Sequence, residues 1–199
     1  MAIIKLNNRA VKDATAVGST TQLGNLVFIS KQTASSSSSV SFTSGINSTY
    51  KEYIFYFNNI HGSAASDFQI NFSIDGGSNY NVTKTTTAIS AYHSESGASA
   101  DVYYIASHDL AQSTSPKKIM GTIYNDNDNS GSGYLHLFNP SDTTFVKHFI
   151  SSTQRTDNAT SNNFYTAGYG NTTSAINAVQ FTMASGNIDS GTIDMYGVL

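Results

Sequence analysis

The side chains in this sequence that can perform chemistry are its histidines, its acidic residues and its many serines. None of the five histidines stands in an H-E-x-x-H or similar spacing that would place metal ligands together. His136 and His148 lie on two strand-like runs joined by a short turn, so they can face each other across strands. Because zinc needs three or four ligands, we expect cross-strand polar residues here rather than a metal site.

One acidic segment has the start of a metal-binding pattern. Asp126-Asn127-Asp128-Asn129-Ser130-Gly131 resembles the first half of a calcium loop, in which carboxylate oxygens converge on the cation. The complete loop needs a Glu six residues after the glycine, and Leu137 occupies that position. We expect a solvated hairpin turn here, and the sequence leaves open whether Asp126 and Asp128 bind calcium.

Catalytic signatures are missing from the sequence. It contains neither the G-x-S-x-G elbow of a serine nucleophile nor the G-x-x-x-x-G-K-[ST] loop that holds phosphate. Glycoside hydrolysis needs two carboxylates about 5–9.5 Å apart, and the few acidic residues are spread over loop-like segments. The sequence therefore predicts a protein that is not an enzyme and uses no cofactor.

Twelve tyrosines and eleven phenylalanines provide a different kind of chemistry. Most of them fit strand interiors, but Tyr92, Tyr165 and Tyr169 lie near glycines in loop-like contexts. Exposed tyrosines among Asn and Thr bind sugars by stacking and hydrogen bonding. We predict Tyr165 and Tyr169 as glycan contacts, with half-buried tyrosines at strand ends as the alternative.

The stretch from Tyr50 to Val82 has the clearest secondary-structure signal. Tyr53–Phe57 is apolar on both faces, and Phe68–Ile74 alternates apolar and polar residues as a strand with one buried face does. Asp75-Gly76-Gly77-Ser78 has the composition of a tight turn. Tyr80 and Val82 then resume the alternation, so this stretch predicts a meander at the centre of an all-β domain.

Short strand-like runs continue along the rest of the chain, separated by polar turns. Lys84–Ser99 predicts a long loop or a short helix, Asp109–Ser113 one helical turn, and Ser151–Asn163 a polar loop. In the run Ala178–Met183, the side chains of Val179, Phe181 and Met183 are expected to point inward. About ten strands with few helix signals predict an antiparallel β-sandwich of jelly-roll type. We expect any working surface to lie in the loops near residues 84–99, 125–133 and 151–175, or in an N-terminal arm.

Composition narrows the possible partners. The chain has 199 residues, ten Lys and Arg residues and a net charge of −3, which predicts no nucleic-acid binding. No run approaches the roughly 18 apolar residues of a membrane span, and the N-terminal residues contain no apolar core of a signal peptide. Cysteine is absent, so the fold does not depend on disulfides.

Residues 1–24 differ from the rest. Ile3, Ile4 and Leu6 form an apolar cluster among the basic residues Lys5, Arg9 and Lys12, and a polar connector follows. The segment is either a loosely ordered terminus or an arm that docks on a partner. We predict a docking arm at 1–24, with Ile3, Leu6 and Arg9 as docking residues, followed by a β-sandwich domain at 25–199.

Several short phrases of the chain carry a family resemblance. They are Gln32-Thr33-Ala34 with the serine run, Phe42–Ile46, Ser48–Tyr50, Phe72–Gly77, Asp109–Thr114, Phe138–Pro140, Phe145–Ile150, Phe164–Tyr169, Ser185–Ile188, Gly191–Ile193 and the leader Met1–Ala10. These phrases resemble structural virion proteins of tailed, especially marine, bacteriophages. The resemblance covers most of the chain, transfers fold rather than activity, and carries over no catalytic residues.

The resemblance implies a virion protein that decorates the capsid or builds a head or tail fibre. Its expected partners are other virion proteins, such as the major capsid, tail or fibre proteins, and further copies of itself, with a trimer favoured. A host-surface carbohydrate-binding adhesin is the alternative function.

Overall fold

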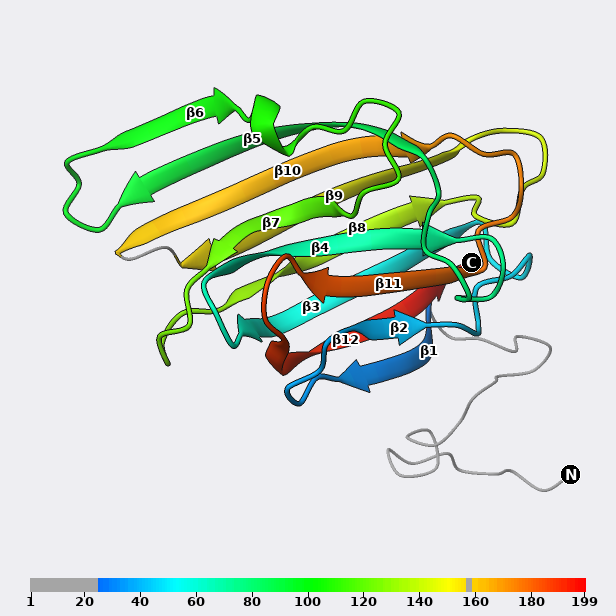
Figure 1. Cartoon of the computed structure of the whole chain (residues 1–199), viewed down its shortest axis with the longest axis horizontal. Helices are drawn as coiled ribbons and strands as arrows, with labels where there is room; N and C mark the ends of the chain where they lie inside the picture. The colour runs from blue at the N-terminus through cyan, green and yellow to red at the C-terminus, as the bar shows by residue number, and fades with distance from the viewer. Residues whose placement is uncertain (1–24, 157–158) are drawn as a thin grey trace, which may run out of the picture.

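The chain folds into a sandwich of two antiparallel β-sheets (Figure 1), as seen in a computed structural model that describes residues 25–156 and 159–199. This confirms the all-β, antiparallel sandwich expected from the sequence. The proposed arm at 1–24, with Ile3, Leu6 and Arg9, lies outside the described residues. Within the described part of the chain, no helix has the length and apolar character needed to span a membrane.

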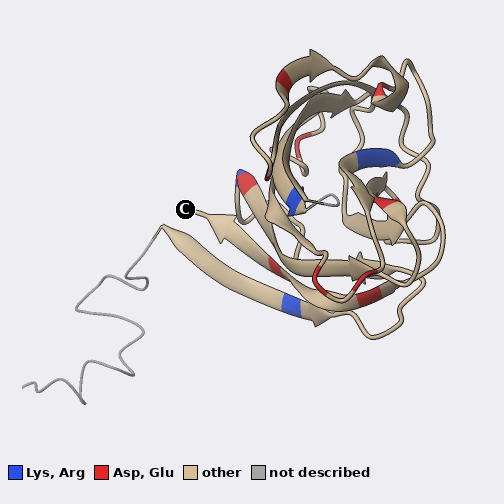
Figure 2. Cartoon of the chain, turned by 90° about the vertical axis from the view of Figure 1, so that its left-hand side faces the viewer, with Lys and Arg blue, Asp and Glu red and all other residues tan. Residues whose placement is uncertain are grey.

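The larger sheet has eight strands and the smaller sheet has four. Figure 2 shows the large sheet curving around the small one, with the few charged residues scattered over both. In spatial order, the large sheet contains β1 (Leu26–Thr33), β12 (Ile188–Val198), β3 (Glu52–Gly62), β8 (Gly131–Phe138), β9 (Lys147–Thr156), β10 (Thr160–Gly170), β5 (Lys84–Ser94) and β6 (Ala100–Tyr104). The small sheet contains β2 (Val40–Phe42), β11 (Ala178–Met183), β4 (Ser66–Ser73) and β7 (Lys117–Ile123).

The core lies between the two sheets, and Phe181 of β11 is near its centre. The Phe181 ring stacks on Phe68 at 5.6 Å between centroids and meets Phe55 and Phe57 edge to face at 5.5 and 5.2 Å. Val179, Phe181 and Met183 are buried, which confirms the inward face expected for Ala178–Met183. Alternation in this strand therefore identified the buried face correctly.

The meander predicted for Tyr50–Val82 is wrong. Strand β3 belongs to the large sheet and β4 to the small one, and the chain then returns to the large sheet as β5. The turn at Asp75 therefore carries the chain from one sheet to the other, and Val82 lies outside any strand. Both strands bury aromatic side chains, and these pack across the sandwich, where they meet more apolar surface than they would side by side in one sheet.

Hydrogen bonds within the Asp75 turn replace those of a hairpin. The Ser73 hydroxyl donates to Asp75 Oδ1 at 2.6 Å, and Asn79 donates its backbone N–H and its side-chain amide to the same carboxylate. These donors lower the pKa of Asp75 to about 2. The turn chemistry predicted for Asp75–Ser78 is therefore present, but it connects two sheets.

Two segments that were not expected to be strands contain them. Lys84–Ser99, expected as a long loop or a short helix, contains β5, and Ser151–Asn163, expected as a loop, contains the end of β9 and the start of β10. Their inward positions carry polar residues, so the period of two in hydrophobicity that marks a half-buried strand is lost. The inward residues in question are Lys84, Thr86, Ser90, Thr153, Arg155 and Asn162. Among the described residues, a helical turn is formed by Ala106–His108, just before the segment Asp109–Ser113 that was expected to hold it.

Three lysines among the described residues, Lys84, Lys117 and Lys147, are fully buried, each with its amine directed at oxygen acceptors. Lys84 Nζ donates to Asn71 Oδ1 at 2.5 Å and to the Val82 carbonyl at 2.7 Å. Lys117 and Lys147 each donate to a backbone carbonyl at 2.6 Å. Burial lowers the pKa of Lys84 and of Lys117 to about 8. The interior is therefore partly polar where the large sheet extends beyond the small one.

Candidate binding surface on the large sheet

The face of the large sheet that points away from the small sheet, here called the outer face, is the strongest candidate for a working surface. In β9 the side chains of His148, Ile150 and Ser152 alternate with buried neighbours and point outward. In β10 the outward residues are Tyr165, Ala167 and Tyr169. Because β9 and β10 pair with each other in the large sheet, their outward residues form a continuous surface.

Aromatic rings follow one another across the outer face from the β1 edge. Phe28 meets Tyr196 at 5.5 Å between centroids, Tyr196 meets Tyr56 at 5.7 Å, and Tyr56 meets Tyr134 at 6.4 Å. Each pair is edge to face, the arrangement that aromatic quadrupoles favour. The series connects β1, β12, β3 and β8, and it leads to the half of the sheet that contains β9 and β10.

A shallow groove continues from Tyr134. The register places Tyr134 opposite Ser152, Ser152 opposite Tyr165, and Tyr165 opposite Ile89. Among these residues and Ile150 lies an apolar depression of about 330 Å³. Tyr134, Ile150, Tyr165 and Ile89 all have between 38% and 47% of their surface exposed. The exposed parts of these four side chains together form a large apolar surface for a β-sheet to leave open to water.

A second depression of about 370 Å³ adjoins the first, with His148 and Tyr169 on its wall. The two share Thr87, Ile150 and Ala167, so together they form one groove across β9, β10 and β5, which we call the outer groove. Small residues form its floor and aromatic residues its walls. Each depression has the volume of a small ligand pocket, and its lining includes no Lys, Arg, Asp or Glu.

The structure places Tyr165 and Tyr169 together, one in each half of the outer groove. Both belong to β10, which runs unbroken through Gly168, so they are not loop residues as the sequence suggested. Tyr92, the third tyrosine considered, instead contacts Tyr103 at 6.1 Å between ring centroids, away from the groove. The sequence missed Tyr134, Ile150 and Ile89, since only the register of the sheet brings them beside Tyr165.

Two pairs of polar side chains lie on the outer face outside the groove and are not part of its lining. Glu52 contacts the ring of His136, and Lys31 lies 3.9 Å from Asp194. His136 and His148 both point outward from neighbouring strands, but the register places His136 opposite Ile150, so the two histidines do not face each other directly. Within residues 25–156 and 159–199, no three histidine, cysteine or acidic side chains gather as metal ligands would.

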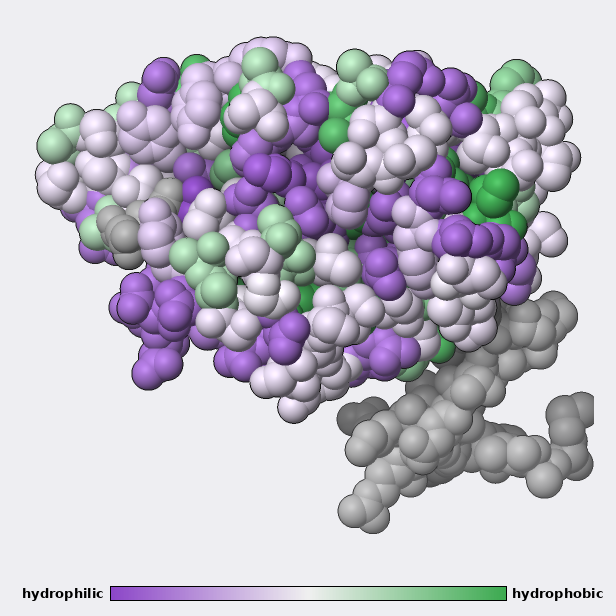
Figure 3. All heavy atoms as spheres, in the orientation of Figure 1, coloured by the Kyte–Doolittle hydropathy of each residue, from purple (hydrophilic) through white to green (hydrophobic). Residues whose placement is uncertain are grey.

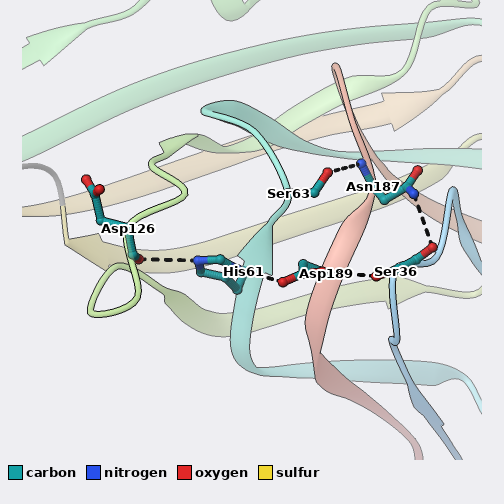
Figure 4. Close-up of polar contacts among 6 residues, drawn as sticks. All are labelled: Ser36, His61, Ser63, Asp126, Asn187 and Asp189. Atoms are coloured by element: carbon teal, nitrogen blue, oxygen red, sulfur yellow. Dashed lines mark hydrogen bonds and ion pairs between the residues drawn. The ribbon is translucent and has the colours of Figure 1, made fainter.

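A polar network at the end of β3 and the start of β12 brings serine, histidine and aspartate side chains together (Figure 4). Asp189 accepts a hydrogen bond from the Ser36 hydroxyl at 3.1 Å and lies 3.5 Å from His61 Nδ1. The carboxylate thus stands between the serine and the histidine. A catalytic triad needs the histidine between the other two, as the base that takes the proton of the serine, so this network ties loops together and does not activate a nucleophile.

The segment Asp126–Ser130 forms a turn between β7 and β8, but these two strands belong to different sheets, so the hairpin expected here is wrong. The backbone carbonyl of Asp126 lies 3.3 Å from His61 Nε2, while its carboxylate points away from His61 (Figure 4). Asp128 Oδ1 accepts a hydrogen bond from the Asn129 side chain at 3.2 Å. The Asp126 carboxylate therefore points away from His61, and the Asp128 carboxylate accepts a hydrogen bond within the segment. This arrangement fits a turn.

The opposite side of the molecule differs from the outer face. Figure 3 views the side of the four-stranded sheet, where hydrophilic and neutral residues dominate and hydrophobic residues form small separate spots. Comparison with models of known protein families, with curated proteins and with solved structures finds no significant match for this chain. Function must therefore be argued from the surface itself.

Proposed function

We propose that this chain is a bacteriophage virion structural protein that acts by protein–protein docking, as a capsid decoration or as a component of a head or tail fibre. The observation that carries the proposal is the aromatic outer face of the eight-stranded sheet, with a groove whose lining contains no Lys, Arg, Asp or Glu. The resemblance of many short phrases to structural virion proteins supports the virion setting. The comparisons with known proteins add nothing to that resemblance.

The strand order supports a jelly-roll scaffold with two additions. Without β5, β6, β9 and β10, the sheets read β1-β12-β3-β8 and β2-β11-β4-β7. Consecutive strands then alternate between the sheets, except that β4 and β7 pair within the small sheet. This is the order of the jelly-roll pattern with its two Greek keys. The two inserted strand pairs extend only the large sheet, and they carry most of the outer groove. We propose that these insertions adapt a common scaffold to a particular partner.

The chemistry of the outer face favours a protein partner. Interface centres are depleted in charge and enriched in aromatic side chains, and the outer groove has both properties. The partners proposed are the major capsid, tail or fibre proteins and further copies of this chain, with a trimer favoured. Many copies on one particle would convert a modest affinity for each site into firm attachment.

Assembly of particles with an outer-face variant tests this proposal. Ile150→Asp places a carboxylate in the groove, and Ile74→Asp makes the same change in the turn that follows β4 of the small sheet, where Ile74 is 42% exposed against 45% for Ile150. Particles should incorporate at least ten times less of the Ile150 variant and normal amounts of the Ile74 variant. Normal incorporation of both, with unchanged melting temperatures, would contradict docking through this face.

A host-surface carbohydrate-binding adhesin is the second candidate, and the positions of Tyr165 and Tyr169 favour it. Tyr165 and Tyr169 are four residues apart on the same face of β10. In this arrangement each tyrosine can stack on a sugar ring. In a glycan array, binding that Tyr165→Ala or Tyr169→Ala reduces at least ten-fold would support the adhesin. Tyr103→Ala is the control, because Tyr103 is 40% exposed outside the groove. Binding insensitive to both groove variants would reject it.

A further inference from the structure

We infer that the outer groove is the docking site for the apolar N-terminal segment of this chain, with Ile3, Ile4 and Leu6 as the residues that enter it. The inference rests on the proposed docking function and names one partner for the same surface. Three observations carry it: the chemistry of the groove, the length of chain before β1, and the place where that chain joins the sheet.

The chemistry of the segment is complementary to that of the groove. The outer groove is lined by Ile89, Tyr134, Ile150, Tyr165 and Tyr169 and contains no charged side chain. Residues 1–12 offer three large aliphatic side chains within four positions. Aliphatic side chains gain most from a pocket with apolar walls, since burial removes both surfaces from water. The basic residues between and after them have long stems that keep their charges in solvent.

The length of the N-terminal chain is sufficient for this contact. Twenty-four residues precede Asn25, and an extended chain of that length spans at most about 80 Å. From β1 to β10 the large sheet has five inter-strand steps, which amount to about 24 Å. The segment can therefore reach the groove of its own copy or that of a neighbouring copy.

The chain also leaves the sheet at the appropriate end. Leu26 at the start of β1 pairs with Val198, Val198 with Glu52, and Glu52 with Phe138. Phe138 ends β8 beside the His148 end of β9, and His148 pairs with Tyr169. The N-terminal chain therefore departs from the same end of the strands at which the Tyr169 half of the groove lies.

The absence of cysteine from the sequence makes a direct test possible in the full chain. Leu6→Cys combined with Ile150→Cys places one thiol on the segment and one in the groove. Under mild oxidation this pair should form a disulfide at least ten times faster than the control pair Leu6→Cys with Ile74→Cys, because docking raises the effective concentration of the two thiols. Adding Ile3→Asp should remove the difference.

The mass of the cross-linked product shows which copy supplies the segment: a monomer indicates the chain's own groove and a dimer a neighbour's, and either supports the inference. Equal rates for the Ile150 and Ile74 pairs, or a fast Ile150 pair that Ile3→Asp does not slow, would overturn it. A glycan that binds the groove without slowing the disulfide would also contradict it, because both cannot occupy the same depression. The test uses purified protein only, so its failure leaves the particle-assembly result for Ile150→Asp independent.

Discussion

At the scale of single residues, the buried lysines are the least expected feature of this protein. Lys84 and Lys117 are as fully buried as a core phenylalanine, yet each amine donates a short hydrogen bond to an oxygen acceptor. Burying a charge costs free energy unless polar partners replace the water that is lost. Carbonyl oxygens replace only part of that water, and the pKa of both groups falls to about 8 as a result.

This shift predicts that the protein becomes more stable as the pH rises from about 8 to 9.5. In that range the lysines of the folded state lose their protons, while those of the unfolded state keep them up to about pH 10.4. The unfolded state then binds more protons, so the free energy of unfolding rises with pH, by up to about 1 kcal/mol per pH unit for each lysine. Urea unfolding at several pH values measures it.

The control for this experiment is Lys84→Met, which should retain only the part of the rise that Lys117 contributes. Lys31→Met, a change at an exposed lysine, should leave the pH dependence intact. Stability that is flat or falls between pH 8 and 9.5 in the unaltered protein would show that the buried amines keep ordinary pKa values.

At the scale of elements, the large sheet depends on close contacts that only glycine permits. Gly133 of β8 has a positive φ of 155°, and a Cβ there would lie 2.4 Å from the Ser152 carbonyl oxygen and 2.6 Å from Thr153 Cα. Both atoms belong to the backbone of β9, which cannot move aside as a side chain can. The pairing of β8 with β9, and with it the position of Tyr134 in the groove, therefore requires glycine.

Gly133→Ala should accordingly destabilise the protein by about 2–4 kcal/mol, which combines an overpacking cost with unfavourable backbone dihedral angles. The matched control is Gly76→Ala. Gly76 also has a positive φ, but a Cβ there meets nothing within 4 Å, so about 1 kcal/mol is expected. Denaturant midpoints provide the comparison, and equal losses for the two variants would show that β8 and β9 adjust to the added methyl group.

At the scale of the whole molecule, the two faces of the sandwich differ in the polarity of their exposed side chains. The four-stranded side is polar, whereas the outer face of the eight-stranded sheet leaves a groove and a series of aromatic rings exposed. Pairs β5–β6 and β9–β10 create this asymmetry, because they widen one sheet without widening the other. A protein that is held on a particle by one face would show this division of surfaces.

Deleting residues 1–24 should prevent the chain from joining particles and leave its melting temperature within about 2 °C, because the described core contains none of those residues. A milder variant with Ile3→Asp and Leu6→Asp should show the same defect, and Lys12→Asp a smaller one. Quantifying the protein in purified particles measures this. Normal incorporation of the truncated chain would refute the docking arm. Hundreds of copies per unaltered particle would indicate capsid decoration, and about a dozen a tail or vertex appendage.

The sequence alone determined the fold class and much of the core. Alternation in Ala178–Met183 identified a buried strand, because its inward positions face the opposite sheet and follow a period of two. The continuous apolar run Tyr53–Phe57 identified another, and its residues are almost all buried. The same rule failed for Lys84–Ser99 and Ser151–Asn163, where inward positions hold lysine, serine, threonine and asparagine. Their polar groups are satisfied by partners distant in sequence, such as Asn162 with Ser90, and no local pattern reveals such partners.

Only the tertiary structure decided where a binding surface can lie. The sequence selected Tyr165 and Tyr169 as exposed tyrosines, but it assigned them to loops and gave them no neighbours. The register of four strands, β8, β9, β10 and β5, brings Tyr134, Ile150 and Ile89 beside them and forms the groove. Cross-strand register depends on contacts between residues far apart in the chain, and for that reason composition and periodicity determined the scaffold while the folded sheet alone determined the site.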